Sequence, residues 1–158
     1  MTIETWEPPI DFSEILELLR VLMPDGKHHI DGDQSRLDSM AETYDEELDT
    51  VRVARRDDRI VGFSRFKPNP PDADATVLAY LWDVAVHPEY QRQGIGRALM
   101  VDLFTECRRS GYKRIWSRTY EDNGPAIALH RTTGFSIIFT KDDSIVWERT
   151  LDAAGETQ

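Results

Sequence analysis

The chain has 158 residues, 40% hydrophobic and 30% charged, which is typical of a globular protein large enough to bury a core. Its 29 acidic and 19 basic residues give a formal net charge of −10, which disfavours nucleic acid and anionic membranes as partners. The single cysteine excludes an intramolecular disulfide, and no apolar run approaches the roughly 20 residues of a membrane span. We therefore expect one cytoplasmic domain over residues 1–158.

The N-terminal part of the chain predicts a short strand and two helices. Residues 2–6 have strand character, and apolar residues at helical spacing predict a helix from Phe12 to Leu22. The same spacing predicts a second helix over 37–48. Between them, 25–33 is a polar loop with two histidines and three aspartates. It lacks the full spacing of a calcium loop, so we predict that no metal binds.

The middle of the chain predicts a β-hairpin and then a central strand. Residues 51–55 and 59–66 are rich in Val, Ile and Phe and flank a turn at 56–58. After a proline-rich loop, 77–86 is almost continuously apolar, as in a strand covered on both faces. Asp83 is the polar residue that interrupts this strand.

A glycine-containing turn follows the central strand and opens a helix. The backbone N–H groups of residues 91–97 would lie at the positive end of the helix dipole, which predicts a site for a pyrophosphate. The Gly-Lys-Ser/Thr of a nucleotide triphosphatase loop is missing, and so is the third glycine of a dinucleotide fold. These two kinds of phosphate site are therefore excluded.

The C-terminal half predicts a strand–helix–strand unit and a final hairpin. The helix after the turn would bury one face and end at Gly111, and 114–120 would then pair in parallel with the central strand. A second helix should begin near Pro125, and 135–140 and 145–151 should pair antiparallel. Residues 152–158 should form a frayed tail. The buried face of the first of these helices would comprise Ile95, Leu99, Leu103, Phe104 and Cys107.

Two motifs in this half resemble the GCN5-related N-acetyltransferase (GNAT) superfamily. One is Gln91-x-x-Gly94-x-Gly96 after a strand that ends in Val-x-His-Pro, and the other runs from Asn123 to Phe135 without a gap. The resemblance covers residues 12–150. It implies an α/β fold with a mixed central sheet of about six or seven strands, helices on both faces, and a parallel central pair that splays apart.

The resemblance also implies acetyl-coenzyme A as the co-substrate. Its pyrophosphate would lie on the loop and its pantetheine arm along the central strand, where an N–H near Val84 would face the developing oxyanion. The residues implied in binding are Val84, Ala85, Val86, Gln91, Arg92, Gln93, Gly94, Ile95, Gly96, Arg97, Asn123 and His130.

Two residues are candidates for the transfer chemistry. An alkyl amine has a pKa of about 10.4 and is almost fully protonated at pH 7, so a carboxylate that accepts its proton is useful. Asp83 fits this role, because an acid in a central strand is costly to bury without a task; alternatively, it pairs with an arginine or caps a loop. His130 stands where the family has a tyrosine. It would protonate the departing thiolate, or else only pack or bind the coenzyme sulfur while water supplies the proton.

Other reactive or aromatic residues have simpler explanations. Cys107 lies on the predicted inner face of a helix, where a lone cysteine normally packs. The aromatic residues Trp82, Trp116 and Tyr120 either line an acceptor channel or, more commonly for central strands, belong to the core, and the same choice is open for Ser117 and Thr119.

We therefore expect an N-acetyltransferase that acts on the primary amine of a small molecule. One alternative is acetylation of a protein N-terminus or lysine, and another, of a different class, is a non-catalytic acyl-coenzyme A sensor. The acidic composition would attract a small cationic amine or a peptide acceptor, although it can serve solubility alone. A homodimer is possible.

Overall fold

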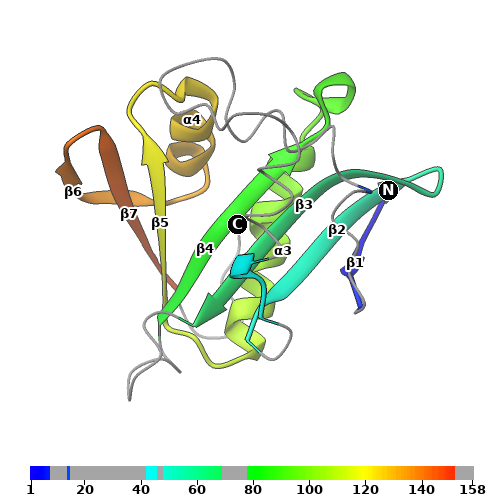
Figure 1. Cartoon of the computed structure of the whole chain (residues 1–158), viewed down its shortest axis with the longest axis horizontal. Coiled ribbons are helices and arrows are strands. Elements are labelled where there is room, and N and C mark those ends of the chain that lie inside the picture. The colour runs from blue at the N-terminus through cyan, green and yellow to red at the C-terminus, as the bar shows by residue number, and fades with distance from the viewer. Residues whose placement is uncertain (8–13, 15–41, 46–47, 69–77, 152–158) are drawn as a thin grey trace. The chain divides into compact units, whose positions relative to one another are not determined.

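The computed structural model describes residues 1–7, 14, 42–45, 48–68 and 78–151. Its strands lie in one mixed sheet in the order β1-β2-β3-β4-β5-β7-β6 (Figure 1), which confirms the predicted α/β sheet of six or seven strands. The elements in chain order are β1 (Thr2–Thr5), β2 (Thr50–Arg56), β3 (Arg59–Pro68), β4 (Leu78–Val86), the 3-10 helix η2 (Pro88–Tyr90), α3 (Ile95–Arg109), β5 (Arg114–Tyr120), α4 (Gly124–Thr132), β6 (Ser136–Lys141) and β7 (Ser144–Thr150).

The chain forms two compact units. Unit 1 comprises Met1–Arg65 and Asp83–Leu99, and unit 2 comprises Phe66–Trp82 and Met100–Gln158. The single domain expected from the length stays a prediction. The predicted helix over 12–22, the polar loop over 25–33 and the tail over 152–158 lie outside the described residues.

The helix predicted over 37–48 is described only near its end, where the prediction is partly wrong. Residues 42 and 43 are helical, but Tyr44 and Asp45 are not. The main-chain oxygen of Asp45 accepts hydrogen bonds from the N–H groups of Leu48 (3.1 Å) and Asp49 (2.7 Å), and its carboxylate accepts a second bond from Leu48 (3.3 Å). An aspartate whose carboxylate accepts the N–H three residues ahead has the geometry of a helix N-cap, so Asp45 begins a new turn and does not continue the helix of residues 42 and 43. Leu48, the last residue of the predicted helix, is 45% exposed.

The predicted hairpin is confirmed in unit 1, with a tighter turn than expected. Asp57 and Asp58 connect β2 and β3 with φ angles of 53° and 63°. Two successive residues with positive φ are typical of the type I′ turn that suits the twist of a two-residue hairpin, and aspartate tolerates this conformation.

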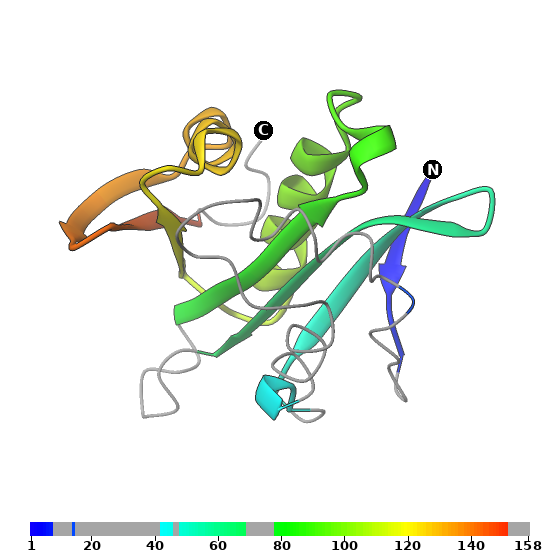
Figure 2. The same ribbon diagram turned by 45° about the horizontal axis from the view of Figure 1, so that its top comes forward.

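The core of unit 1 fastens the beginning of α3 to the sheet. Ala54, Val61, Ile95 and Leu99 form a buried apolar cluster against which Val84, Val86 and Tyr90 pack. The strands β1 and β2 of this unit lie side by side in Figure 2. Gly62 permits this close approach, because a Cβ atom there would lie 3.0 Å from the main-chain oxygen of Ala85 and 3.0 Å from Leu99 Cδ1. The first turn of α3 is thereby held at the end of β4.

Unit 2 contains the predicted parallel pair. Leu78–Leu81 of β4 pair with Arg114–Ser117 of β5, although both strands continue beyond this ladder. β7 pairs antiparallel with β5 along its whole length, and β6 pairs antiparallel with β7. The buried face predicted for α3 is confirmed, because all five of its residues are buried. Among the described residues, no helix is both long and apolar enough to cross a bilayer.

Candidate active site

The loop between η2 and α3 has the geometry of an anion site. Arg92 and Gly94 have φ angles of 62° and 83°, in the left-handed region. Such residues turn successive backbone N–H groups toward a common side, forming a concave site for an anion. Ala98 N–H donates to the Gly94 oxygen (3.0 Å), so the N–H groups of Ile95, Gly96 and Arg97 precede the first bond of the helix. The first turn of α3 has no acidic residue, so the dipole there is uncompensated.

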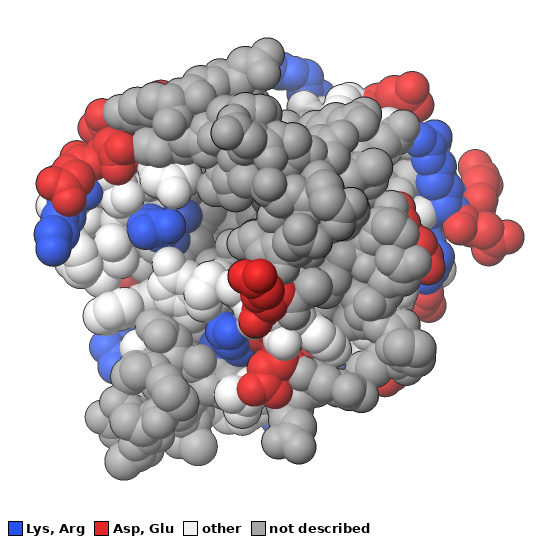
Figure 3. Space-filling view, in the orientation of Figure 1, with Lys and Arg blue, Asp and Glu red and all other residues white. Residues whose placement is uncertain are grey.

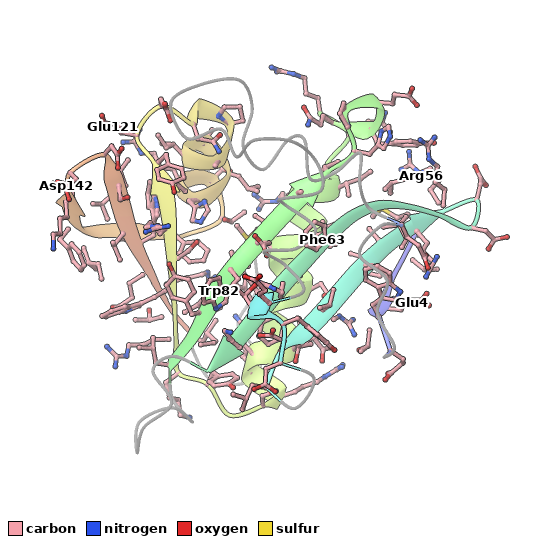
Figure 4. The ribbon with its side chains drawn as sticks, viewed as in Figure 1. Glu4, Arg56, Phe63, Trp82, Glu121 and Asp142 are labelled. Atoms are coloured by element: carbon pink, nitrogen blue, oxygen red, sulfur yellow. The ribbon has the colours of Figure 1, made fainter. Side chains whose placement is uncertain are left out.

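Two glutamines hold this loop in place within unit 1. The Gln91 side chain donates through Nε2 to the Val86 oxygen (3.1 Å), which ties the start of the loop to the end of β4. Arg56 Nη1 donates to Gln93 Oε1 (2.7 Å), and the Arg56 guanidinium lies 5.6 Å from the centre of the Tyr90 ring. Figure 4 labels Arg56 at the hairpin end of β2. The β2–β3 hairpin therefore supports the loop from the side.

Asp83 lies on β4 as predicted, and its partner is Arg65 of β3. Asp83 Oδ2 is 3.0 Å from Arg65 Nε, and the two side chains are 17% and 3% exposed. Burial raises the pKa of the Asp83 carboxyl above its usual range, the positive charge of Arg65 lowers it and the negative charge of Asp49 raises it; burial prevails. The carboxylate is thus paired but remains a stronger base than an exposed aspartate.

Asn123 caps α4, which begins next to Pro125 as the sequence predicts. Its Oδ1 accepts a hydrogen bond from Ala126 N–H (3.2 Å), and Pro125 occupies the first turn. The cap fixes where α4 begins, and with it the position of His130 on the last turn. A role for Asn123 in binding the coenzyme stays a prediction.

His130 is buried in unit 2, with 2% of its surface exposed and both ring nitrogens engaged. Nδ1 lies 2.7 Å from the Ala126 oxygen and Nε2 lies 2.8 Å from Ser117 Oγ. The carbonyl can only accept, so Nδ1 carries the proton and Nε2 accepts from the Ser117 hydroxyl in the neutral ring. Burial lowers the pKa of His130 to about 4, although its bond to Ala126 opposes the shift. At neutral pH its single N–H is therefore directed to the helix.

This burial predicts a pH dependence of stability. The unfolded histidine titrates near 6.5 and the folded one near 4, so between these values the unfolded state binds more protons and stability falls as the pH falls. We expect acidification from pH 7 to pH 4.5 to remove about 2 kcal/mol more unfolding free energy from the wild type than from His130→Gln, measured by urea denaturation. Equal losses in the two proteins would contradict a buried neutral His130.

The remaining candidates divide between core and surface. Cys107 is buried and its thiol pKa is raised by burial, as expected of a packing residue. Ser117 and Thr119 are also buried, and Thr119 Oγ1 accepts from Trp147 Nε1 (2.9 Å). Trp82, for which a core position was the commoner expectation, is 42% exposed on β4 (Figure 4).

Trp116 and Tyr120 of β5 are both partly buried. Trp116 Nε1 donates to Glu148 Oε2 (2.7 Å), and Tyr120 lies under the guanidinium of Arg118, 5.4 Å from the ring centre. A place for either ring in an acceptor channel stays a prediction.

The sequence reasoning missed Arg65 as the partner of Asp83 and Arg56 as a support of the loop. A signal for Arg65 was present: an arginine within a strand of Val, Ile and Phe needs a partner if that strand is buried. No comparable signal marked Arg56, which belongs to a predicted turn.

The charged residues of the described chain do not form a field of one sign on the face shown in Figure 3, where acidic and basic side chains are interspersed. Among the described residues, no group of three His, Cys, Asp or Glu side chains is placed to hold a metal ion. The 25–33 loop lies outside them, so the lack of a metal stays a prediction.

The known proteins that this chain resembles are acetyltransferases. Residues 12–135 match the profile of a family described as "Acetyltransferase (GNAT) family". The chain is 43% identical over 58 residues, 37% of its length, to the [Ribosomal protein bS18]-alanine N-acetyltransferase of Escherichia coli K12. It is 33% identical over 86 residues, 54% of its length, to the mycothiol acetyltransferase of Kocuria rhizophila. These matches span only 39% and 28% of the two relatives.

Solved structures share the fold over almost the whole chain. The PaiA N-acetyltransferase of Thermoplasma acidophilum, solved in complex with coenzyme A, superposes with a TM-score of 0.72 at 19% identity, and the match covers 95% of this chain and 99% of that one. At this identity the likeness shows the fold, and it includes strands and helices on both sides of the loop between η2 and α3.

Proposed function

The chain belongs to the acetyltransferase (GNAT) family, and we propose that it moves an acetyl group from acetyl-coenzyme A directly to the primary amine of a small molecule. The observation that carries the proposal is the loop between η2 and α3. There, Arg92 and Gly94 have positive φ angles and the first turn of α3 has no acidic residue, two features that support a site for an anion. A pyrophosphate is the anion that this loop would hold, and the thioester supplies the acetyl group.

Each part of the loop has a proposed task in binding the donor. The amides of Ile95, Gly96 and Arg97 would bind pyrophosphate oxygens, and the exposed side chains of Arg92 and Arg97 would add charge-assisted contacts. Binding energy gained here is remote from the reacting carbon and serves to hold it in position.

Asp83 is proposed as the base that accepts a proton from the acceptor ammonium, directly or through a water molecule. Burial raises the pKa of its carboxyl. This pKa is therefore closer to that of an amine than the pKa of an exposed aspartate is, which favours proton transfer. Its side chain also retains partial exposure, which leaves a path for a proton. These two properties together favour Asp83 over a fully buried or a fully solvated acid.

His130 is proposed as the second catalytic residue, the proton donor to the departing thiolate. Its one N–H is bound to the Ala126 oxygen, so the ring would have to leave that bond to donate its proton and would regain the proton from water; the alternative is that His130 only packs and water protonates the thiolate directly. Substitution separates these possibilities. If His130→Phe loses activity and His130→Tyr retains it, a proton donor at this position is supported; equal activity in both removes His130 from the chemistry.

A protein N-terminus is the second candidate acceptor. It is favoured by the relative with 43% identity, whose name gives the alanine of a ribosomal protein as the acceptor. That match covers 37% of this chain, so it supports the transfer of an acetyl group to an amine more strongly than it supports any one acceptor.

A panel assay tests the proposal. The purified protein is incubated with acetyl-coenzyme A and, separately, with small polyamines, amino acids, aminoglycosides and peptides with free N-termini, and released thiol is measured. We expect turnover to be fastest with a small amine. Turnover only with peptides would move the assignment to the second candidate. Coenzyme binding by calorimetry without turnover on any acceptor would contradict the enzymatic function and favour a sensor of acyl-coenzyme A.

A further inference from the structure

Arg65 is the buried cation next to the proposed base. It lies in the part of β3 that belongs to unit 1, with 3% of its side chain exposed, and its Nε is 3.0 Å from Asp83 Oδ2. A charged group is rarely buried to this degree without a partner, because removing it from water is costly. The pair therefore constrains the Asp83 carboxylate more than a surface ion pair would.

Other contacts of Arg65 fix the direction of its guanidinium. Its Nη2 donates to Thr43 Oγ1 (3.1 Å) while its Nε forms the ion pair with Asp83, so two nitrogens of one guanidinium face two different segments of the chain. A planar guanidinium held at two of its nitrogens has little freedom to rotate. Arg65 can therefore present Nε to Asp83 in one orientation.

We propose that Arg65 is a positioning residue of the transfer reaction: it keeps the Asp83 carboxylate ionised and fixed in the orientation in which it accepts the proton of the acceptor ammonium. This inference rests on the proposed function, since it gives Asp83 the role of base. It adds a second residue to the acceptor half of the site. Without Arg65, the carboxylate would lose the ion-pair partner that the structure gives it, while the negative charge of Asp49 would still act on it.

The charges around Asp83 give the expected pKa shifts a sign. Among the described residues, Arg65 of β3 and Asp49, just before β2, are the charged groups that act on the carboxyl, and their effects on its pKa have opposite signs. Removing Arg65 leaves burial and Asp49, both of which raise the pKa. Removing the charge of Asp49 leaves Arg65, which lowers it. Two substitutions in one site should therefore shift the same pKa in opposite directions.

The experiment measures this pKa in two ways in the full chain. In Arg65→Met we expect the acid limb of kcat/KM for the amine to move to higher pH by about 1 to 3 units, the range typical of losing an opposite charge at this distance. In Asp49→Asn it should move to lower pH, and Arg65→Lys should lie between the wild type and Arg65→Met. The KM for acetyl-coenzyme A should stay within about twofold, because neither residue belongs to the loop. Arg109→Met is the matched control, since Arg109 is an exposed arginine on α3 whose partner is Glu106.

Carboxyl NMR of protein labelled with ¹³C-aspartate gives the second readout, with the Asp83 signal identified by its loss in Asp83→Asn. An unchanged Asp83 titration in Arg65→Met overturns the proposal. A shifted titration with an unshifted rate profile also overturns it, because Asp83 would then not be the base. Lack of turnover by the wild type contradicts the proposed function instead, and the NMR titration then decides alone whether Arg65 controls Asp83. If Arg65→Met does not fold, Arg65→Lys and Asp49→Asn give the same two-sided test.

Discussion

Replacing Asp83 with asparagine is expected to lower kcat/KM for the amine acceptor by about 100-fold or more, the usual contribution of a positioned general base. Asparagine keeps the size of the side chain and can still contact Arg65, but it cannot take up a proton. The Kd for coenzyme A should stay within about twofold, since Asp83 precedes the loop that would hold the pyrophosphate. Steady-state kinetics and calorimetry on the same preparations measure the two quantities.

A matched control and a stability measurement keep this result interpretable. Asp142→Asn removes a carboxylate from the exposed β6–β7 turn, where φ is 55° and asparagine is well tolerated, and should leave kcat/KM unchanged. Asp83→Asn also leaves Arg65 without its partner charge, which destabilises a buried cation. Thermal unfolding therefore has to show that the variant is folded at the assay temperature. A folded Asp83→Asn protein with full activity on every accepted amine would remove Asp83 from the mechanism.

The second large effect is expected at the loop, where Gly94→Ala should raise the Kd for coenzyme A about 10-fold to 100-fold. Gly94 has a φ of 83°, and a Cβ atom there would meet no other atom of the protein within 4 Å, so the strain is conformational rather than a clash. An alanine favours negative φ and would turn at least one N–H away from the pyrophosphate. A hydrogen bond to a charged group is worth about 1.5 to 3 kcal/mol, which corresponds to this range of affinity.

Gly111→Ala is the control that distinguishes the effect of backbone strain on stability from the effect of Gly94→Ala on coenzyme A binding. Gly111 has a φ of 88°, and a Cβ atom added to it would also meet nothing within 4 Å, but it lies after α3 and away from the loop in sequence. Both variants should lose about 1 kcal/mol of unfolding free energy, because both force alanine into the left-handed region. Only Gly94→Ala should lose affinity for coenzyme A. An equal loss of affinity in both, or in neither, would contradict the pyrophosphate site.

The course of the central strand and its loop could be predicted from the sequence because their signals are local. A run of apolar residues that ends at His87-Pro88, followed by Gly94 and Gly96 and a helical pattern, is enough to place a strand, a turn and a helix. The buried face of α3 follows in the same way from spacing. The end of the helix predicted over 37–48 was wrong for an equally local reason that spacing does not record: the Asp45 carboxylate accepts the Leu48 N–H, which is the geometry of a helix N-cap, where spacing predicts a continuous helix.

Residue types and their order were therefore sufficient for the strands of the sheet, the helix after the central strand and the family, since backbone conformation and side-chain periodicity are properties of neighbouring residues. The chemical states of Asp83 and His130 depended on the folded structure. Their burial, the approach of Arg65 to one and of Ser117 to the other, and the resulting pKa shifts arise from segments brought together by sheet pairing and helix packing. A carboxylate and an imidazole take their protonation from the dielectric and charges around them, and the order of residues along the chain does not specify either.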